Sequence, residues 1–141
     1  MWVVADPPTT PRTVVIVVFD DVTLLDVAGP AEVFAEANRF GADYRLKVAS
    51  VDGADVTTSV GTEFAVTESI SAIDSADTVL VAGGENLVGR PIDPALVAAV
   101  RAVPGRTRRL ASICTGCFSP SSARPRPTTS KRSASTQREP H

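Results

Sequence analysis

Long apolar runs, a secretory leader and a set of metal-binding side chains are all missing from this chain of 141 residues. The apolar stretch from Val14 to Phe19 is as long as any in the chain, and a membrane-spanning helix needs roughly 20 such residues. The first residues, MWVVADPP, have no basic segment and no sustained apolar segment, so they do not form a signal peptide. We therefore expect a cytoplasmic protein that makes no contact with a membrane.

Cysteine and histidine are both scarce. Cys114 and Cys117 are the only cysteines, and two cysteines three residues apart cannot staple a fold as disulfides do in small secreted proteins. The single histidine, His141, is the last residue. We therefore expect neither a metal site nor a bound cofactor, and the cysteines serve either local chemistry or ordinary packing.

Charge is divided unevenly along the chain. Residues 1–118 carry 9 basic and 15 acidic side chains, a net charge of −6, whereas residues 119–141 carry 5 basic and 1 acidic, a net charge of +4. A content of 43% apolar and 21% charged residues is typical of a soluble globular protein. The length allows one domain with a real core and leaves no room for two.

The first half of the chain alternates strand and helix patterns. Residues 12–19 are a continuous β-branched run, which predicts a strand buried on both faces of a parallel sheet. Residues 25–40 follow with apolar side chains at helical spacing, and Pro30 suits a first helical turn. Residues 44–51 alternate apolar and polar side chains, which predicts a strand nearer the edge of the sheet.

The second half repeats this alternation. Residues 56–58 and 64–66 predict a short hairpin, and residues 69–75 a short helix. Residues 78–81 are an apolar strand that runs directly into Gly83 and Gly84, the kind of strand-to-loop change found at ligand sites of open α/β sheets.

A further helix and strand complete the pattern. Asp93 caps a helix that begins at Pro94 and ends before Pro104-Gly105, and residues 109–113 form the next strand. Alternating strands and helices with short connections predict an α/β fold with a doubly wound, mostly parallel sheet.

The pattern stops after Phe118. Residues 119–141 contain 6 Ser, 3 Thr and 4 Pro, and their apolar residues are two alanines, so we expect a disordered tail. Pro120 interrupts the helix that should follow the last strand, which leaves the sheet incomplete at the C-terminus. We therefore divide the chain into a flexible leader (1–11), a partial domain (12–118) and the tail (119–141), and we hypothesise a change of reading frame near residues 117–120.

The segment Ile113-Cys114-Thr115-Gly116 lies where a buried strand meets a predicted helix start. Such a sharp turn presents a nucleophile above the sheet, and the N–H groups of the following helix favour the thiolate. The backbone amides of Thr115 and Gly84 are then natural donors to an oxyanion.

Three motifs carry a resemblance to a known superfamily. Residues 17–34 resemble the N-terminal signature of ThiJ/PfpI domains. Val81-Ala82-Gly83-Gly84 resembles the loop that follows a strand in these domains, and residues 111–116 resemble their cysteine elbow. The resemblance, over residues 12–118, implies a flavodoxin-like fold of the class I glutamine amidotransferase type. Members are commonly dimers, so a homodimer is a further expectation.

Two branches of that superfamily share the sequence motifs LLDVAGPAEVF and SICTG. One contains the amidotransferase-like N-terminal domains of AraC-type transcriptional regulators, which sense a small-molecule ligand and bind DNA through separate helix-turn-helix units that this sequence does not contain. The other contains isonitrile-hydratase-like enzymes, and resemblance to them implies Cys114 as nucleophile, Asp26 as its acid/base partner and Thr115 as a positioning residue. We favour the regulator, partly because Asn86-Leu87 after the glycine pair is more similar to that branch. We expect no specific DNA binding by this chain.

Each site residue also has an ordinary structural interpretation. Cys114 could simply pack, Asp26 could cap the first helix, and Glu32 could lie on its solvated face. Gly83 and Gly84 could serve only as a tight turn. A redox pair of Cys114 with Cys117 is less favoured, because the family that this chain resembles usually has a small apolar residue at the position of Cys117. A nucleic-acid role for the basic tail is less favoured because the tail has no aromatic residue. The site proposed from the sequence therefore comprises Cys114 and Asp26 with Gly83, Gly84, Thr115 and Gly116.

Overall fold

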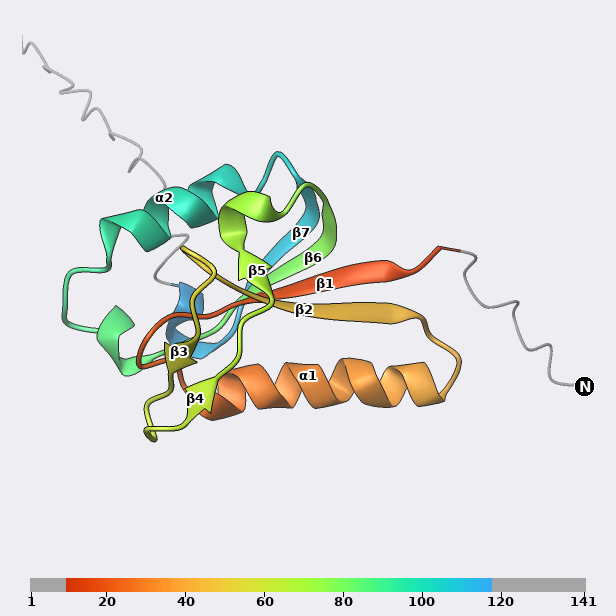
Figure 1. The fold of residues 1–141 in the computed structure, drawn as a ribbon, viewed down its shortest axis with the longest axis horizontal. Helices are drawn as coiled ribbons and strands as arrows, with labels where there is room; N and C mark the ends of the chain where they lie inside the picture. The colour runs from red at the N-terminus through yellow and green to blue at the C-terminus, as the bar shows by residue number, and fades with distance from the viewer. Residues whose placement is uncertain (1–9, 118–141) are drawn as a thin grey trace, which may run out of the picture.

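The structure, a computed structural model, describes residues 10–117 and contains a five-stranded parallel sheet with a helix on each face (Figure 1). The strands lie in the order β5-β2-β1-β6-β7, and every neighbouring pair in this sheet is parallel. Their bounds are β1 (Arg12–Val17), β2 (Tyr44–Ser50), β5 (Glu68–Ser69), β6 (Ala76–Val81) and β7 (Thr107–Ser112). The predicted doubly wound α/β fold is confirmed.

Two helices form the outer layers. Helix α1 (Leu24–Arg39) connects β1 to β2 on one face, and α2 (Pro94–Ala102) connects β6 to β7 on the other (Figure 1). The chain thus winds outward from β1 in both directions, as the handedness of parallel crossovers requires. The carboxyl ends of all five strands consequently lie at one edge of the sheet.

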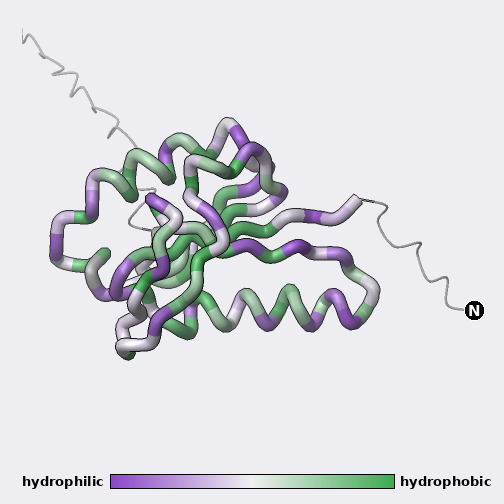
Figure 2. Tube along the Cα trace, in the orientation of Figure 1, coloured by the Kyte–Doolittle hydropathy of each residue, from purple (hydrophilic) through white to green (hydrophobic). Residues whose placement is uncertain are grey.

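Strand β1 is the centre of the core. Val14 to Val18 are all buried, and successive side chains face opposite sides of the sheet. Val15 and Val17 join the cluster beneath α2, whereas Ile16 and Val18 join the cluster beneath α1. Figure 2 shows the hydrophobic residues concentrated along these central strands. Each such side chain contributes about 1.5–3 kcal/mol on burial, so β1 anchors both layers.

The helix ends differ in how well the sequence predicted them. Asp93 accepts a hydrogen bond from the N–H of Ala95 at 2.9 Å and Pro94 is the first residue of α2, as expected. In α1, however, Pro30 lies in the interior and not in the first turn, because the helix already begins at Leu24. Pro30 has no N–H to donate to the carbonyl four residues earlier, and the helix continues past it to Arg39.

The excursion between β2 and β6 is less helical than predicted. Strands β3 (Val56–Thr57) and β4 (Glu63–Phe64) form the expected antiparallel hairpin. The helix predicted over residues 69–75 is wrong: Ser69 belongs to β5, and only a 3-10 turn, η1 (Ile70–Ala72), follows. Pairing with β2 keeps the chain extended as far as Ser69, which leaves room for a single turn before β6.

Strand β7 is the outermost described strand on its side of the sheet. Ala111 and Ser112 are exposed, while Leu110 is half-buried against the cluster beneath α2. No helix among residues 10–117 is long and apolar enough to cross a membrane. The predicted disordered tail and most of the predicted leader lie outside the described residues.

Candidate ligand site at the cysteine elbow

Three loops converge at the carboxyl edge of the sheet. They follow β1, β6 and β7, which are neighbours, so residues far apart in sequence meet there. The N–H of Ala82 donates to the carbonyl of Val17 at 3.1 Å, and the N–H of Ile113 donates to that of Val81 at 3.0 Å. These bonds extend the sheet pairing into the loops and fix their relative positions.

Cys114 occupies the turn out of β7. Its φ is +52°, in the left-handed region that non-glycine residues adopt only at a cost, and its side chain is exposed. A short 3-10 turn, η3 (Cys114–Cys117), follows. The chain therefore leaves β7 through a strained turn at Cys114, and a 3-10 turn follows where the sequence predicted the start of a helix.

Thr115 joins this elbow to the glycine pair. Its Oγ1 accepts a hydrogen bond from the N–H of Gly84 at 2.9 Å and donates one to the carbonyl oxygen of Gly84 at 3.0 Å. One hydroxyl therefore satisfies both backbone groups of a residue in a different loop. The Gly84 amide, predicted as an oxyanion donor, is paired with Thr115 in this structure.

Asp26 reaches the same loop from the first turn of α1. Its Oδ2 accepts a hydrogen bond from the N–H of Gly83 at 3.1 Å. Asp26 does not cap the helix, because the residue at the cap position is Thr23, whose side chain makes no capping bond. The structure thus places Asp26 beside the glycine pair, and among residues 10–117 no hydrogen bond joins its carboxylate to Cys114.

Glycine at positions 83 and 84 allows this close packing. A Cβ on Gly83 would lie 2.5 Å from Asp26 Oδ2, 2.9 Å from Thr115 Oγ1 and 3.0 Å from the carbonyl oxygen of Ile113. Asp26 and Thr115 therefore both contact the Gly83 backbone. Gly84 has a φ of −171°, which is extended backbone, so the pair is not a left-handed turn. Close approach of neighbouring groups explains these glycines better than a tight turn does.

Two residues of the site were not predicted from the sequence. The ring of Phe19 lies against Gly84, since a Cβ there would be 2.8 Å from Phe19 Cε2. Asp21, with a φ of +65°, places its carbonyl oxygen 2.9 Å from the same point. A β-bridge between Val22 and Gly84 reinforces this contact. The paired Asp20-Asp21 directly after the apolar run of residues 12–19 was the available signal in the sequence.

The remaining candidates are placed less closely. Gly116 lies within η3. Glu32 is exposed on α1, which agrees with the interpretation that it lies on the solvent-facing side of that helix. The side chains of Asn86 and Cys117 are not among those described, so the suggested pairing of Cys114 with Cys117 lies outside the structure. Among the described residues, no group of three or more His, Cys, Asp or Glu side chains is arranged to hold a metal ion.

The sequence model of the DJ-1/PfpI family matches residues 12–130. A protein from Streptomyces lividans, "Uncharacterized protein in cpoL 5'region", is 49% identical over 108 residues, which is 77% of each chain.

Two further matches are to regulators. The HTH-type transcriptional regulator Rv1931c of Mycobacterium tuberculosis is 42% identical over 45 residues, which is 32% of this chain and only 17% of that protein. The crystal structure of an AraC family transcriptional regulator from Pseudomonas putida superposes with a TM-score of 0.66 at 23% identity, over 79% of this chain and 70% of that one.

Proposed function

The chain belongs to the DJ-1/PfpI family, and from this premise we propose that its domain senses a small-molecule ligand, as part of a transcriptional regulator of the AraC type. The curated regulator with 42% identity supports this choice, although the match spans a small part of that protein. The fold likeness to the regulator from Pseudomonas putida is consistent with it.

The pairing of polar groups at the elbow carries the proposal. Thr115 bonds to both backbone groups of Gly84, and Asp26 accepts from Gly83, so these groups are already paired with one another in this structure. A general base must lie within hydrogen-bonding reach of the group that it activates. Among the described residues Cys114 has no hydrogen bond to Asp26, and the only histidine of the sequence is residue 141. This arrangement favours reversible binding over covalent catalysis.

A ligand would use these groups as follows. A carbonyl or similarly polarised oxygen displaces Thr115 Oγ1 from the Gly84 N–H and gains a second donor from the Thr115 backbone N–H. In this proposal Cys114 and Asp26 contact the ligand, together with the backbone of Gly83 and Gly116. Release of Thr115 loosens the link between the β6 and β7 loops, which is a structural change that a regulator can transmit.

The enzyme alternative has its own supporting observation. Cys114 is exposed on strained backbone, which is how nucleophile elbows present a reactive group. In that case Cys114 is the nucleophile of an isonitrile-hydratase-like or related reaction, and Asp26 must turn from Gly83 toward the sulfur to act as acid or base.

The regulator proposal also sets the expected partners and location. We expect such a regulator to work in the cytoplasm and, because members of the superfamily that it resembles are commonly dimers, as a homodimer. Its DNA contacts belong to helix-turn-helix units, and the two α-helices among residues 10–117 both pack on the sheet. We therefore assign ligand binding, and no specific DNA binding, to the part of the chain described here.

Ligand binding and turnover can be separated in one experiment. The 141-residue protein and its Cys114→Ser variant are incubated with a bacterial metabolite extract; thermal unfolding reports binding, and mass spectrometry reports any metabolite consumed. A sensor gives a rise in melting temperature that survives Cys114→Ser, with no metabolite consumed. Consumption by the wild type that disappears in Cys114→Ser would reject the sensor in favour of the enzyme.

A further inference from the structure

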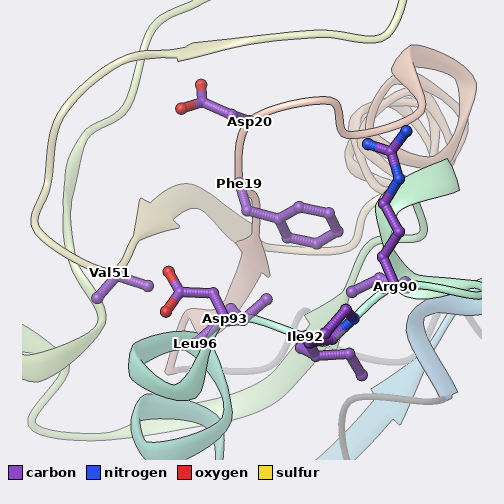
Figure 3. A pocket seen from close by; sticks show the side chains of 9 residues that line it. Phe19, Asp20, Val51, Arg90, Ile92, Asp93 and Leu96 are labelled. Carbon is purple, nitrogen blue, oxygen red and sulfur yellow. The ribbon is translucent and has the colours of Figure 1, made fainter.

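A cavity of about 340 Å³ opens at the carboxyl edge of the sheet, on the α2 side of Phe19 (Figure 3). Its apolar wall is formed by Phe19 and Val51 after β1 and β2, by Ile92 just before α2, and by Leu96 in the first turn of α2; Leu87 also lines it. In the view of Figure 3, Phe19 lies between Asp20 and the group formed by Asp93, Ile92 and Leu96. This volume is within the range of small-molecule sites, which are mostly apolar with a few polar groups.

A second cavity of about 340 Å³ adjoins the first and shares Phe19, Asp20, Val51 and Asp93 with it. It adds Asp52 and Asp55 from the loop after β2. We call the two cavities together the Phe19 cleft. Among the described residues lining it, Arg90 is the single basic one, and it lines only the first cavity.

Backbone N–H groups hold the four carboxylates of the cleft. Their partners are Thr57 for Asp20, Ala54 for Asp52, Val66 for Asp55 and Ala95 for Asp93, at 2.8–3.0 Å. In Asp52 the bond from Ala54 N–H, with smaller contributions from its own N–H and the Ser50 hydroxyl, lowers the pKa below its ordinary value of 3.8. Each bond uses one carboxylate oxygen and fixes where the negative charge lies.

The whole carboxyl edge is acidic. Its acidic residues are Asp20, Asp21, Asp26, Asp52, Asp55, Glu63, Glu85 and Asp93, whereas Arg90 is the one basic residue described there. The other basic residues lie within the strands, or at the opposite edge and the far ends of both helices, as Arg12, Arg39 and Arg101 do. The N-terminus of α2, which alone would attract an anion, is already capped by the carboxylate of Asp93. The field at the cleft therefore favours a cation.

We propose that the Phe19 cleft binds a small organic cation whose apolar body lies against Phe19, Val51 and Leu96 and whose ammonium or guanidinium group is attracted by the carboxylates that line the cleft, those of Asp20, Asp52, Asp55 and Asp93. This inference rests on the proposed sensor function. It names the chemical class of the ligand, and it adds a second binding site, which lies on the other side of Phe19 from the elbow. Strand order reverses between β1 and β6, and ligands of open α/β sheets bind at that point.

Phe19 links the cleft to the elbow. One part of its ring lies against Gly84, whose backbone is bound to Thr115, and the ring also lines the cleft. A ligand that moves the ring therefore acts on the contact that Gly84 makes with the β7 loop. This places the cleft where occupancy changes the elbow without contact with Cys114.

Three molecules of equal length test the charge preference: hexylamine as the cation, hexanol as the neutral analogue and hexanoate as the anion. Binding to the 141-residue protein is measured by titration calorimetry at low salt. We expect hexylamine to bind, and hexanol and hexanoate to bind at least several-fold more weakly. Added salt should lower only the affinity for hexylamine. Equal binding of hexanoate or hexanol would overturn the proposal.

Variants locate the site. Asp20→Asn and Asp93→Asn keep an oxygen for Thr57 and Ala95, and asparagine caps helices as well as aspartate does. Each variant should lower the affinity for hexylamine by about fivefold, which is the upper end of the range expected for a partly exposed ion pair. Asp43→Asn, an exposed carboxylate at the opposite edge, is the matched control and should change nothing. Unchanged binding in the cleft variants, or an equal loss in Asp43→Asn, would place the cation elsewhere.

The two proposals fail in different ways. If hexylamine does not bind but a metabolite from the extract still stabilises the Cys114→Ser variant, the cleft assignment is wrong and the sensor stands. If hexylamine binds as expected while a metabolite is consumed in a Cys114-dependent reaction, the sensor is wrong and the cleft stands.

Discussion

The hydroxyl of Thr115 both accepts from the N–H and donates to the carbonyl of Gly84, 31 residues earlier in the chain. A single side chain thereby ties the loop after β7 to the loop after β6. Both loops carry candidate site residues, so this contact decides whether the elbow and the glycine pair act as one unit.

Replacing Thr115 with valine keeps the shape of the side chain and removes both hydrogen bonds. The buried N–H of Gly84 then loses its partner, which should cost about 1–3 kcal/mol in the free energy of unfolding, whereas its carbonyl keeps the hydrogen bond from the N–H of Leu87 at 3.1 Å. Urea denaturation followed by circular dichroism measures the change. Thr115→Ser retains the hydroxyl and is the matched control; equal stability of the valine and serine variants would show that the pairing contributes nothing.

Alanine should be tolerated very differently at two glycines. At Gly83 the new Cβ meets Asp26 Oδ2 at 2.5 Å and Thr115 Oγ1 at 2.9 Å, so we expect Gly83→Ala to cost about 1–3 kcal/mol. At Gly29, inside α1, the added Cβ would have no atom within 4 Å outside its chain neighbours and the nearby helix backbone, so alanine should stabilise the helix by about 0.5–1 kcal/mol. Melting temperatures of the two variants should move in opposite directions, and a shared direction would contradict the packing described for Gly83.

The backbone at Cys114 should prefer glycine to alanine. A φ of +52° costs a residue with a Cβ about 1–2 kcal/mol, whereas glycine adopts it freely. Cys114→Gly should therefore unfold at a higher temperature than Cys114→Ala, the reverse of the order usual in helices and strands. If the alanine variant is the more stable, the elbow does not have the strained conformation seen here.

Asp52 gives a dependence of stability on pH. Its pKa is lower in the folded protein than the ordinary 3.8, chiefly because Ala54 N–H donates to the carboxylate, so the ionised form is favoured by folding. The contribution is present above pH 3.8 and is lost as pH falls through the lower folded pKa. Urea midpoints measured between about pH 2 and 6 should fall less steeply with acid in Asp52→Asn than in the wild type. Asp74→Asn shows whether loss of any carboxylate has the same effect; identical curves for wild type and Asp52→Asn would exclude the contribution.

Local sequence patterns predicted the elements whose determinants are local. The β-branched run of β1 is buried on both faces, and the cap formed by Asp93 with Pro94 marks the start of α2. The helix predicted over residues 69–75 was wrong because strand pairing, which no local pattern encodes, extends the chain to Ser69. Pro30 lies in the second turn of α1 and not in the first, although the predicted start of that helix, residue 25, is within one residue of the observed start at Leu24.

The sequence by itself determined which residue types stand at the ends of β1, β6 and β7, and so that a cysteine elbow and a glycine pair would exist. Only the tertiary structure decided that Asp26 binds Gly83 across 57 residues, that Thr115 binds Gly84, and that Phe19 separates the elbow from a cleft lined by four aspartates. The physical reason is that parallel strands bring their carboxyl ends to one edge, and which loops then touch depends on the order of strands in the sheet, β5-β2-β1-β6-β7.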